Sequence, residues 1–405
     1  MLIARRVASA YRAAFSGLAP EVWLLALGAF VNRAGTMVLP FLGLYLTGRL
    51  GMSTLDAGRV LALYGIGSVL GSSLGGWLSD RLGAVRVQLL SLATTGVAFL
   101  VLGHARGHWQ VSLAVLVAAT VSDTFRPAMM VAIAHYSPGA TRTRSFALLR
   151  LAANAGMAIG PAAGGVLAMH HYTWLFIGDA ATCWAAATLL ALTLGVPRSP
   201  IRRDDPVTAD ATGDRSPFSD GPFLAFLVLI FLLACAFFQI WSTLPLDLRT
   251  TFHLPETLIG GLLAANALLI VCFEMLLLRA IEHRDHLRLV GVGAALVGLG
   301  LGLLALGGGL LTALASSLVW TLGEMLSMPI SNAVVATRAP LKRTGAYMGA
   351  YTVAFSLAFV VAPVAGTAIY SRWGGHALWP GIAVLGLLLG VGFSFLSGPL
   401  RTAAE

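Results

Sequence analysis

Long apolar stretches separated by short polar ones run along almost the whole chain. Each stretch has roughly 20 mostly apolar residues, the length that an α-helix needs to cross the hydrocarbon core of a bilayer. The pattern predicts an all-α membrane protein with twelve transmembrane helices. The predicted ranges are 21–47, 56–78, 86–104, 109–135, 143–169, 173–195, 222–250, 256–278, 287–306, 309–336, 343–370 and 377–397.

One polar stretch lies near the middle of the chain. Residues 196–221 combine several aspartates with arginines and prolines, a composition typical of a solvated, flexible connection. The chain is therefore predicted to form a six-helix bundle over 1–195, a cytoplasmic linker over 196–221 and a second six-helix bundle over 222–405.

The two predicted bundles share an internal repeat. A shift of 202 residues aligns glycines, prolines and loop charges of the first half with those of the second. It places Gly58 on Gly260, Asp80 on Glu282, Arg86 on Arg288, Pro127 on Pro329, Pro161 on Pro363 and Gly164 on Gly366. In the first predicted helix, a shift that is larger by three residues places Pro40 on Pro245. Such repeats predict pseudo-symmetric bundles with a substrate site near the bilayer midplane.

Composition supports a membrane location. Hydrophobic residues make up 58% of the chain and charged residues only 11%, whereas soluble domains carry about 25% charged residues. A net charge of +9 would suit nucleic acid, but the basic residues stand singly or in pairs between apolar runs, so we expect no nucleic-acid binding. The three cysteines lie in apolar runs without metal-ligand spacing, so no metal site is expected.

The distribution of basic residues predicts the orientation. If both termini are cytoplasmic, most of the 26 lysines and arginines fall in cytoplasmic loops and tails. We therefore expect a multi-pass protein of a bacterial inner membrane, a monomer whose partners are lipid and a small-molecule substrate.

A loop motif lies between the second and third predicted helices. Its sequence is Gly76-Trp-Leu-Ser-Asp80-Arg81-Leu-Gly83-Ala84-Val85-Arg86. Together with the repeat, the motif resembles the loop signature of the major facilitator superfamily, and the resemblance covers essentially the entire chain. Ala84 and Val85 stand where that family often has basic residues. The resemblance implies the superfamily fold and a cytoplasmic gate formed by Gly76, Asp80, Arg81, Gly83 and Arg86; the alternative is that these charges only set the topology.

A second motif lies in the fifth predicted helix, with Gly156, Gly160, Pro161, Gly164 and Gly165. It is similar to the motif associated with antiporters of the superfamily, which implies export. The spacing places Gly156, Gly160 and Gly164 on one helical face, where small residues let another helix approach closely. Helix packing without any bearing on transport direction is the alternative.

Polar side chains inside predicted transmembrane helices are functional candidates, because an unpaired charge at mid-bilayer is costly. Most of them lie in the first, fourth, seventh and tenth helices, which line the central cavity in the superfamily. The candidate substrate-binding residues are Asn32, Arg33, Arg126, Arg150, Asn154, Gln239, Trp241, Trp320, Tyr347 and Tyr351.

Three carboxylates are candidates for proton coupling: Glu324, Asp123 and Glu274. Glu324 has no basic neighbour in its own helix, and burial favours the neutral form of a carboxyl group. Asp123 lies three residues from Arg126, so it either binds a proton or forms a permanent ion pair. Asp179 and Asp247 lie nearer the outer surface, where simple solvation would explain them.

These features predict a secondary active transporter that exports small amphipathic molecules by alternating access and draws its energy from the proton gradient, without a cofactor. Positive and negative charges nearly balance in the predicted cavity, which favours a neutral, zwitterionic or anionic substrate. The alternative is a proton-coupled importer of a zwitterionic or polar solute such as a small peptide or sugar derivative. A membrane enzyme or sensor is not expected, because the chain has no phosphate-binding loop and no set of metal ligands.

Overall fold

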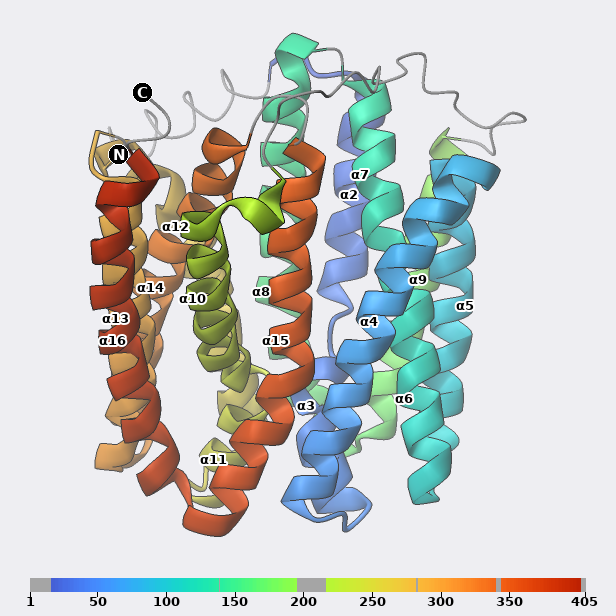
Figure 1. The fold of residues 1–405 in the computed structure, drawn as a ribbon. Helices are drawn as coiled ribbons and strands as arrows, with labels where there is room; N and C mark the ends of the chain where they lie inside the picture. The colour runs from blue at the N-terminus through green and yellow to red at the C-terminus, as the bar shows by residue number, and fades with distance from the viewer. Residues whose placement is uncertain (1–15, 138, 195–215, 282, 340–343, 402–405) are drawn as a thin grey trace, which may run out of the picture. The chain divides into compact units, whose positions relative to one another are not determined.

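The computed structural model describes residues 16–137, 139–194, 216–281, 283–339 and 344–401, and these residues form helices and connecting loops with no strand (Figure 1). Twelve helical segments are long and apolar enough to cross a membrane, which confirms the predicted all-α membrane fold. They span Pro20–Arg49, Thr54–Leu82, Ala84–His104, His108–Tyr136, Arg144–His170, Thr173–Leu194, Gly221–Thr250, Glu256–Ile281, His286–Leu306, Gly309–Arg338, Ala346–Trp373 and Gly375–Gly398.

Several of these segments are built from more than one helical element. In chain order the elements are α2 (Pro20–Ala34), α3 (Val38–Leu44), η1 (Tyr45–Arg49), α4 (Thr54–Leu82), α5 (Ala84–His104), α6 (His108–Asp123), α7 (Phe125–Tyr136), α8 (Gly139–His170), α9 (Thr173–Leu194), η2 (Pro217–Ser219), α10 (Gly221–Phe237), η3 (Phe238–Ile240), α11 (Thr243–Thr250), α12 (Glu256–Ile281), α13 (His286–Gly302), η4 (Leu303–Leu306), α14 (Gly309–Arg338), α15 (Thr344–Trp373) and α16 (Gly375–Arg401).

The chain forms two compact units. The first unit contains residues 1–38 and 66–203, and the second unit contains residues 39–65 and 204–405. Helix α4 begins in the second unit and enters the first at Ile66. The domain boundaries predicted from the polar stretch 196–221 remain a prediction, and most of that stretch lies outside the described residues.

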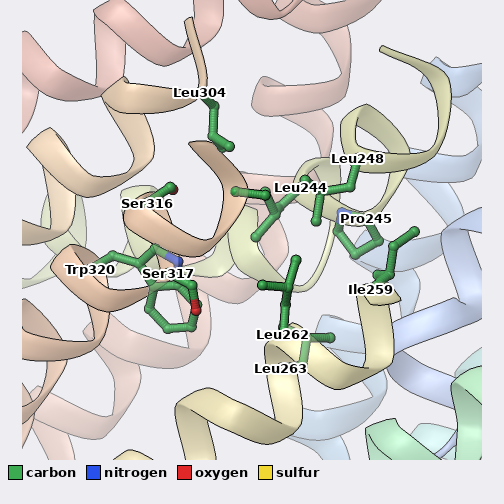
Figure 2. A pocket seen from close by; sticks show the side chains of 11 residues that line it. Leu244, Pro245, Leu248, Ile259, Leu262, Leu263, Leu304, Ser316, Ser317 and Trp320 are labelled. Carbon is green, nitrogen blue, oxygen red and sulfur yellow. The ribbon is translucent and has the colours of Figure 1, made fainter. Parts of the chain in front are cut away.

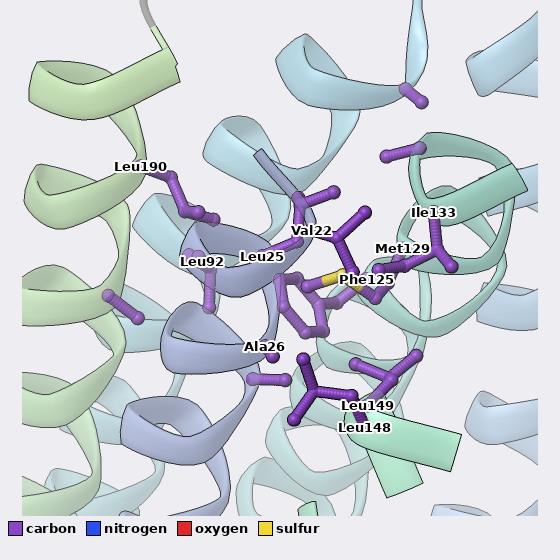
Figure 3. Packing of buried hydrophobic residues seen from close by; sticks show 14 of the residues in the cluster. Val22, Leu25, Ala26, Leu92, Phe125, Met129, Ile133, Leu148, Leu149 and Leu190 are labelled. Carbon is purple, nitrogen blue, oxygen red and sulfur yellow. The ribbon is translucent and has the colours of Figure 1, made fainter. Parts of the chain in front are cut away.

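A buried apolar cluster organises the first unit (Figure 3). Leu25 and Ala26 of α2 pack with Phe125 of α7, Leu148 of α8 and Leu190 of α9. Lipid tails are as apolar as these side chains, so close van der Waals packing, and not escape from water, stabilises the cluster. The result is a bundle in which α2 is surrounded by α7, α8 and α9.

Close helix contacts in the second unit depend on glycine. A β-carbon at Gly293 of α13 would lie 2.7 Å from the backbone oxygen of Gly323 in α14, and one at Gly298 would lie 2.7 Å from Cα of Gly386 in α16. Small residues allow such backbone approach in membrane helices. Helix α13 is therefore packed closely between α14 and α16.

The first and seventh transmembrane segments are both discontinuous. The first breaks between Ala34 and Val38, and the seventh breaks between Phe237 and Thr243. The shift that aligns Pro40 with Pro245 also aligns the two breaks. A proline clashes with the carbonyl group four residues earlier and removes a helical hydrogen bond, and each of the two breaks lies directly before such a proline.

Candidate functional site

A polar cluster surrounds the break in the first transmembrane segment. Oδ2 of Asp179 in α9 accepts hydrogen bonds from the backbone N–H groups of Met37, at 3.3 Å, and Val38, at 3.1 Å. One turn further along α9, the Sγ atom of Cys183 accepts a hydrogen bond from Nδ2 of Asn32 at 3.7 Å. Asp179 is only 5% exposed, so the expectation that it is simply solvated was wrong: the break supplies backbone donors to a buried carboxylate.

The antiporter-like motif packs against the same break. A β-carbon at Gly156 of α8 would lie 2.6 Å from the backbone oxygen of Phe30, and one at Gly160 would lie 2.9 Å from that of Thr36. Pro161 lies inside α8 and is buried. The glycines thus let α8 approach the end of α2 where that helix stops. This geometry explains the packing, and the link of the motif to export remains a prediction.

The Asp123 and Arg126 side chains lie at the junction of two helices. Asp123 ends α6 and is half-buried, while Arg126 lies in the first turn of α7 and is exposed. Arg150 is exposed and Asn154 is half-buried on α8. Arg33 is half-buried in the last turn of α2.

Glu324 belongs to a polar chain inside the second unit. Nδ2 of Asn266 in α12 donates to Oε2 of Glu324 at 2.9 Å and lies 3.1 Å from Oγ1 of Thr321. The Thr321 hydroxyl in turn donates to the backbone oxygen of Ser317 at 2.5 Å. Asn266 is a buried amide that the sequence analysis did not single out. It holds the carboxylate in one orientation from a neighbouring helix.

Gln239 occupies the break in the seventh transmembrane segment. Its Oε1 atom accepts hydrogen bonds from the hydroxyls of Thr243, at 2.7 Å, and Ser242, at 3.4 Å. Its Nε2 atom donates to the backbone oxygen of Ala362 in α15 at 2.8 Å. The side chain fills the space where Gly366 would carry a β-carbon. A neutral amide therefore ties this break to α15.

The two candidate tyrosines of α15 are engaged within the second unit. The Tyr347 hydroxyl donates to Oδ2 of Asp220 at 3.1 Å, and the Tyr351 hydroxyl lies 2.9 Å from that of Ser331. Arg338 makes two hydrogen bonds to Asp220, Nε to Oδ2 at 2.9 Å and an Nη atom to Oδ1 at 2.8 Å. Asp220 thus joins the start of α10 to α14 and α15.

Trp320 lines a small apolar cavity in the second unit (Figure 2). Leucines of α11, α12 and η4 line the same cavity, together with Ser316 and Ser317. Trp241, just before α11, is half-buried, and Glu274 of α12 is buried. The candidates of the second unit therefore lie on several helices and form more than one local cluster.

The loop motif has a local structural basis at Gly83. This residue follows α4, precedes α5 and has φ = 88°, a conformation that favours glycine. Asp80 is exposed, and the Arg81 guanidinium lies 4.0 Å from the centre of the Trp77 ring. Gly76 has open space where a side chain would be, and Arg86 is half-buried. The gating role of these residues remains a prediction.

Asp247 is a second buried carboxylate whose surroundings differ from the solvated setting expected from the sequence. It is 1% exposed and accepts hydrogen bonds from Nε1 of Trp379 at 2.8 Å and from the Tyr370 hydroxyl at 2.9 Å. The expectation of simple solvation was wrong here too, because aromatic donors from α15 and α16 enclose the carboxylate. Within the described ranges, no group of three or more His, Cys, Asp or Glu side chains could hold a metal ion.

Comparison with known proteins identifies the family. The family model of the Major Facilitator Superfamily matches residues 25–363 and 226–404. The uncharacterized MFS-type transporter YttB of Bacillus subtilis is 25% identical over 92% of this chain and 94% of its own. A Na(+), Li(+), K(+)/H(+) antiporter of Planococcus maritimus is 24% identical over 83% of this chain and 86% of its own.

A more local match is the quinolone resistance protein NorA of Staphylococcus aureus, 24% identical over 39% of this chain and 41% of its own. Among solved structures, a peptide transporter POT in complex with sulfate superposes with a TM-score of 0.83 at 15% identity and covers 96% of both chains. That likeness shows the fold. With the family model matched over most of its length and twelve apolar helices, this chain is a membrane transport protein, not an enzyme, and it belongs to the Major Facilitator Superfamily.

Proposed function

We propose that this protein is a proton-coupled exporter of small amphipathic molecules that works by alternating access in the bacterial inner membrane, with both termini cytoplasmic. The names of two relatives support exchange and efflux: one is a cation/proton antiporter and the other confers quinolone resistance. The duplicated architecture supports alternating access, because the two halves of such transporters rock around a site near the midplane.

The position of Glu324 carries the proposal of proton coupling. This half-buried carboxylate lies in the middle of α14, an apolar membrane-spanning helix, and accepts a hydrogen bond from the neutral amide of Asn266. Ionisable groups inside a membrane mark proton and substrate pathways. We assign proton binding first to Glu324 and then to Asp123 and Glu274, and the energy source is the proton gradient, with no cofactor.

The substrate is proposed to contact the polar and aromatic residues singled out in the sequence. Arg33, Asn32 and Trp320 supply positive charge, an amide and an aromatic surface of the kind that suits a neutral, zwitterionic or anionic amphipath. Asp80, Arg81 and Arg86 are proposed to form the cytoplasmic gate.

Transport into proteoliposomes under an imposed pH gradient tests the proposal. Norfloxacin, a fluorescent zwitterionic quinolone, is the first probe, because a quinolone resistance protein is among the relatives. The gradient should drive norfloxacin movement in wild type, and Glu324→Gln should reduce it by about 100-fold or more, the usual contribution of a proton-transfer group. Asp56→Asn, the matched control, removes a carboxylate paired with the exposed Arg59 and should have no effect.

The outcomes separate coupling from direction. Undiminished gradient-driven transport in both Glu324→Gln and Asp123→Asn would refute the coupling assignment. For direction, cells that lack the protein should accumulate more norfloxacin than cells that produce it. A loss of uptake in cells that lack the protein would establish import of a polar solute in place of export.

Asn266 provides a second test of Glu324. Its amide orients the carboxylate, so Asn266→Leu should lower proton-coupled transport by about tenfold, the usual effect of losing a hydrogen bond to a charged group. Asn266→Gln, which keeps an amide donor, should retain part of the activity. The ratio of protons to substrate, measured with a pH-sensitive dye, should fall with Asn266→Leu. An unchanged ratio would show that Asn266 acts only in packing.

A further inference from the structure

The break in the first transmembrane segment is held by two neighbouring helices. Gly156 and Gly160 of α8 contact the end of α2, while Asp179 of α9 accepts hydrogen bonds from the N–H groups of Met37 and Val38. Met37 and Val38 open the second piece of the segment, where backbone N–H groups have no helical partner four residues earlier. The Met37 N–H is shared with the backbone oxygen of Gly35 at 2.6 Å, whereas the Val38 N–H donates to Asp179, so the carboxylate links the start of α3 to α9.

The surroundings of Asp179 are almost entirely uncharged. From α2, Arg33 acts on the carboxylate electrostatically, and on α9 itself Cys183 is the neighbouring titratable group. Residues 96–103 of α5 and 156–167 of α8, which lie beside this part of α9, contain no titratable side chain. Helix α3 contains none either, and Tyr45 follows directly after it. Burial disfavours the charged carboxylate, whereas the two backbone donors and the charge of Arg33 favour it.

The attachment point coincides with a boundary in the fold. The first unit ends its opening segment at Val38, and the chain enters the second unit at Leu39. The corresponding break in the second unit is bridged by Gln239, a side chain that does not titrate. Of the two aligned breaks in the described part of the chain, the first is bridged by the titratable Asp179 and the second by Gln239. The first break is also where the chain passes from the first unit into the second.

We propose that Asp179 is a proton-binding site in its own right, and that its ionised form fastens the start of α3 to α9 while its protonated form releases it. The proton adds to a carboxylate oxygen, and no other bond is made or broken. A neutral carboxyl group is a weaker acceptor than a carboxylate, because charge-assisted hydrogen bonds are the stronger ones. Asp179 lies six residues from the start of α9 at Thr173, a depth of ~9 Å along the helix.

This site is separate from Glu324, and its action does not depend on export. The test therefore measures the break itself, not transport. Hydrogen–deuterium exchange of the full chain in lipid nanodiscs is followed for the segment 33–44 from about pH 5 to about pH 9, with exchange times scaled to the intrinsic rate at each pH. The aligned stretch 238–245, which corresponds to 33–40, is bridged by Gln239 and contains no titratable side chain, so it is the internal control.

In wild type, protection of the 33–44 segment against exchange should fall by about tenfold on acidification. A hydrogen bond to a charged acceptor changes an equilibrium constant by about that factor. Asp179→Asn, which has nearly the same shape and cannot ionise, should show the low protection at every pH. The 238–245 segment should not respond. Glu324→Gln should leave the response of 33–44 intact, which separates this proposal from the proposed coupling site.

Three results would overturn the proposal: pH-independent protection in wild type, an unchanged pH response in Asp179→Asn, or a response that disappears with Glu324→Gln. If Asp179→Asn does not fold, Asp179→Glu replaces it. That variant keeps a titratable group at a shifted position, so the pH midpoint of the exchange should move. An unmoved midpoint would assign the response to another group.

Discussion

Asp220 shows how one side chain can join three helices at a membrane boundary. It accepts a hydrogen bond from the Phe223 N–H at the start of α10, two from Arg338 of α14 and one from Tyr347 of α15. Burial raises the pKa of Asp220. The hydrogen bonds from Arg338, Phe223 and Tyr347 and the positive charge of Arg338 lower it by more, so the pKa lies below its usual value. The ionised form is therefore the one that the fold stabilises.

The stability of the protein should follow the ionisation of Asp220. Because the pKa of Asp220 is lower in the folded than in the unfolded state, its contribution is complete above about pH 4 and is lost as the pH falls through the folded pKa. The melting temperature of wild type should drop in that range more steeply than that of Asp220→Asn. At neutral pH, Arg338→Ala should cost roughly 3 kcal/mol, since it leaves a buried carboxylate without its cation.

The control for this prediction is Asp56→Asn, which breaks an exposed ion pair with Arg59 and should cost less than about 1 kcal/mol. Melting would be followed by tryptophan fluorescence in detergent. If the melting temperatures of wild type and Asp220→Asn fell equally on acidification, other carboxylates would be responsible for the loss of stability at low pH. A stability loss for Arg338→Ala no larger than that of Asp56→Asn would show that the pair contributes little.

At the same scale, the sequence predicted which residues are polar but not always what surrounds them. Glu324 was identified because it interrupts a long apolar run. The burial of Asp179 and Asp247 was missed, because it depends on distant partners. The donors to Asp179 become available only through the break at Met37 and Val38, and Trp379 is 132 residues from Asp247. Local sequence carries no signal for either.

At the scale of elements, the antiporter-like motif acts through backbone proximity. Gly156→Ala would place a β-carbon 2.6 Å from the Phe30 carbonyl oxygen, which belongs to a helix backbone and cannot rotate away. We expect α2 and α8 to be pushed apart at a cost of about 1–3 kcal/mol. The melting temperature should fall accordingly, and transport should fall with it if the contact is used during the transport cycle.

Gly349→Ala is the matched control, because this glycine also lies inside a helix and has open space where a β-carbon would be. Alanine should be neutral or slightly stabilising there, since it favours helix more than glycine does. If the two variants melted at the same temperature, close packing of α2 and α8 would not explain the motif.

The sequence predicted the spans but not their interruptions. Each predicted range overlaps one observed span, because length and apolarity are averaged over roughly 20 residues. The breaks at the first and seventh spans were missed although Pro40 and Pro245 were aligned. A proline in a membrane helix can be accommodated by a kink, by neighbouring side chains or by a full break. Which of these occurs depends on groups such as Asp179 and Gln239 that supply new partners.

At the scale of the whole molecule, the repeat and the packing divide the chain differently. The repeat assigns residues 39–65 to the first half, whereas contacts place them in the second unit. A β-carbon at Gly58 would lie 2.8 Å from the backbone oxygen of Pro363, and one at Gly65 would lie 2.9 Å from that of Phe359. The repeat shows which residues are similar in sequence, whereas the contacts show which residues pack together. If the halves rock against each other, the contacts of 39–65 with α15 have to separate during each cycle.

A reversible cross-link at this contact tests that requirement. The β-carbon of Thr367 would lie 2.9 Å from one added at Gly58, slightly closer than the ~3.8 Å of a disulfide, so a small shift allows the bond. In a background with Cys183, Cys235 and Cys272 replaced by alanine, the pair Gly58→Cys and Thr367→Cys should cross-link on mild oxidation.

Oxidation should then abolish gradient-driven norfloxacin transport in the double variant, and a reductant should restore it, because a covalent bond between α4 and α15 holds the two halves together on that side. Each single cysteine variant, oxidised in the same way, separates the cross-link from the effect of the substitution. Full transport by a quantitatively cross-linked protein would mean that α4 and α15 stay together throughout the cycle, and that the halves defined by the repeat do not separate at this contact.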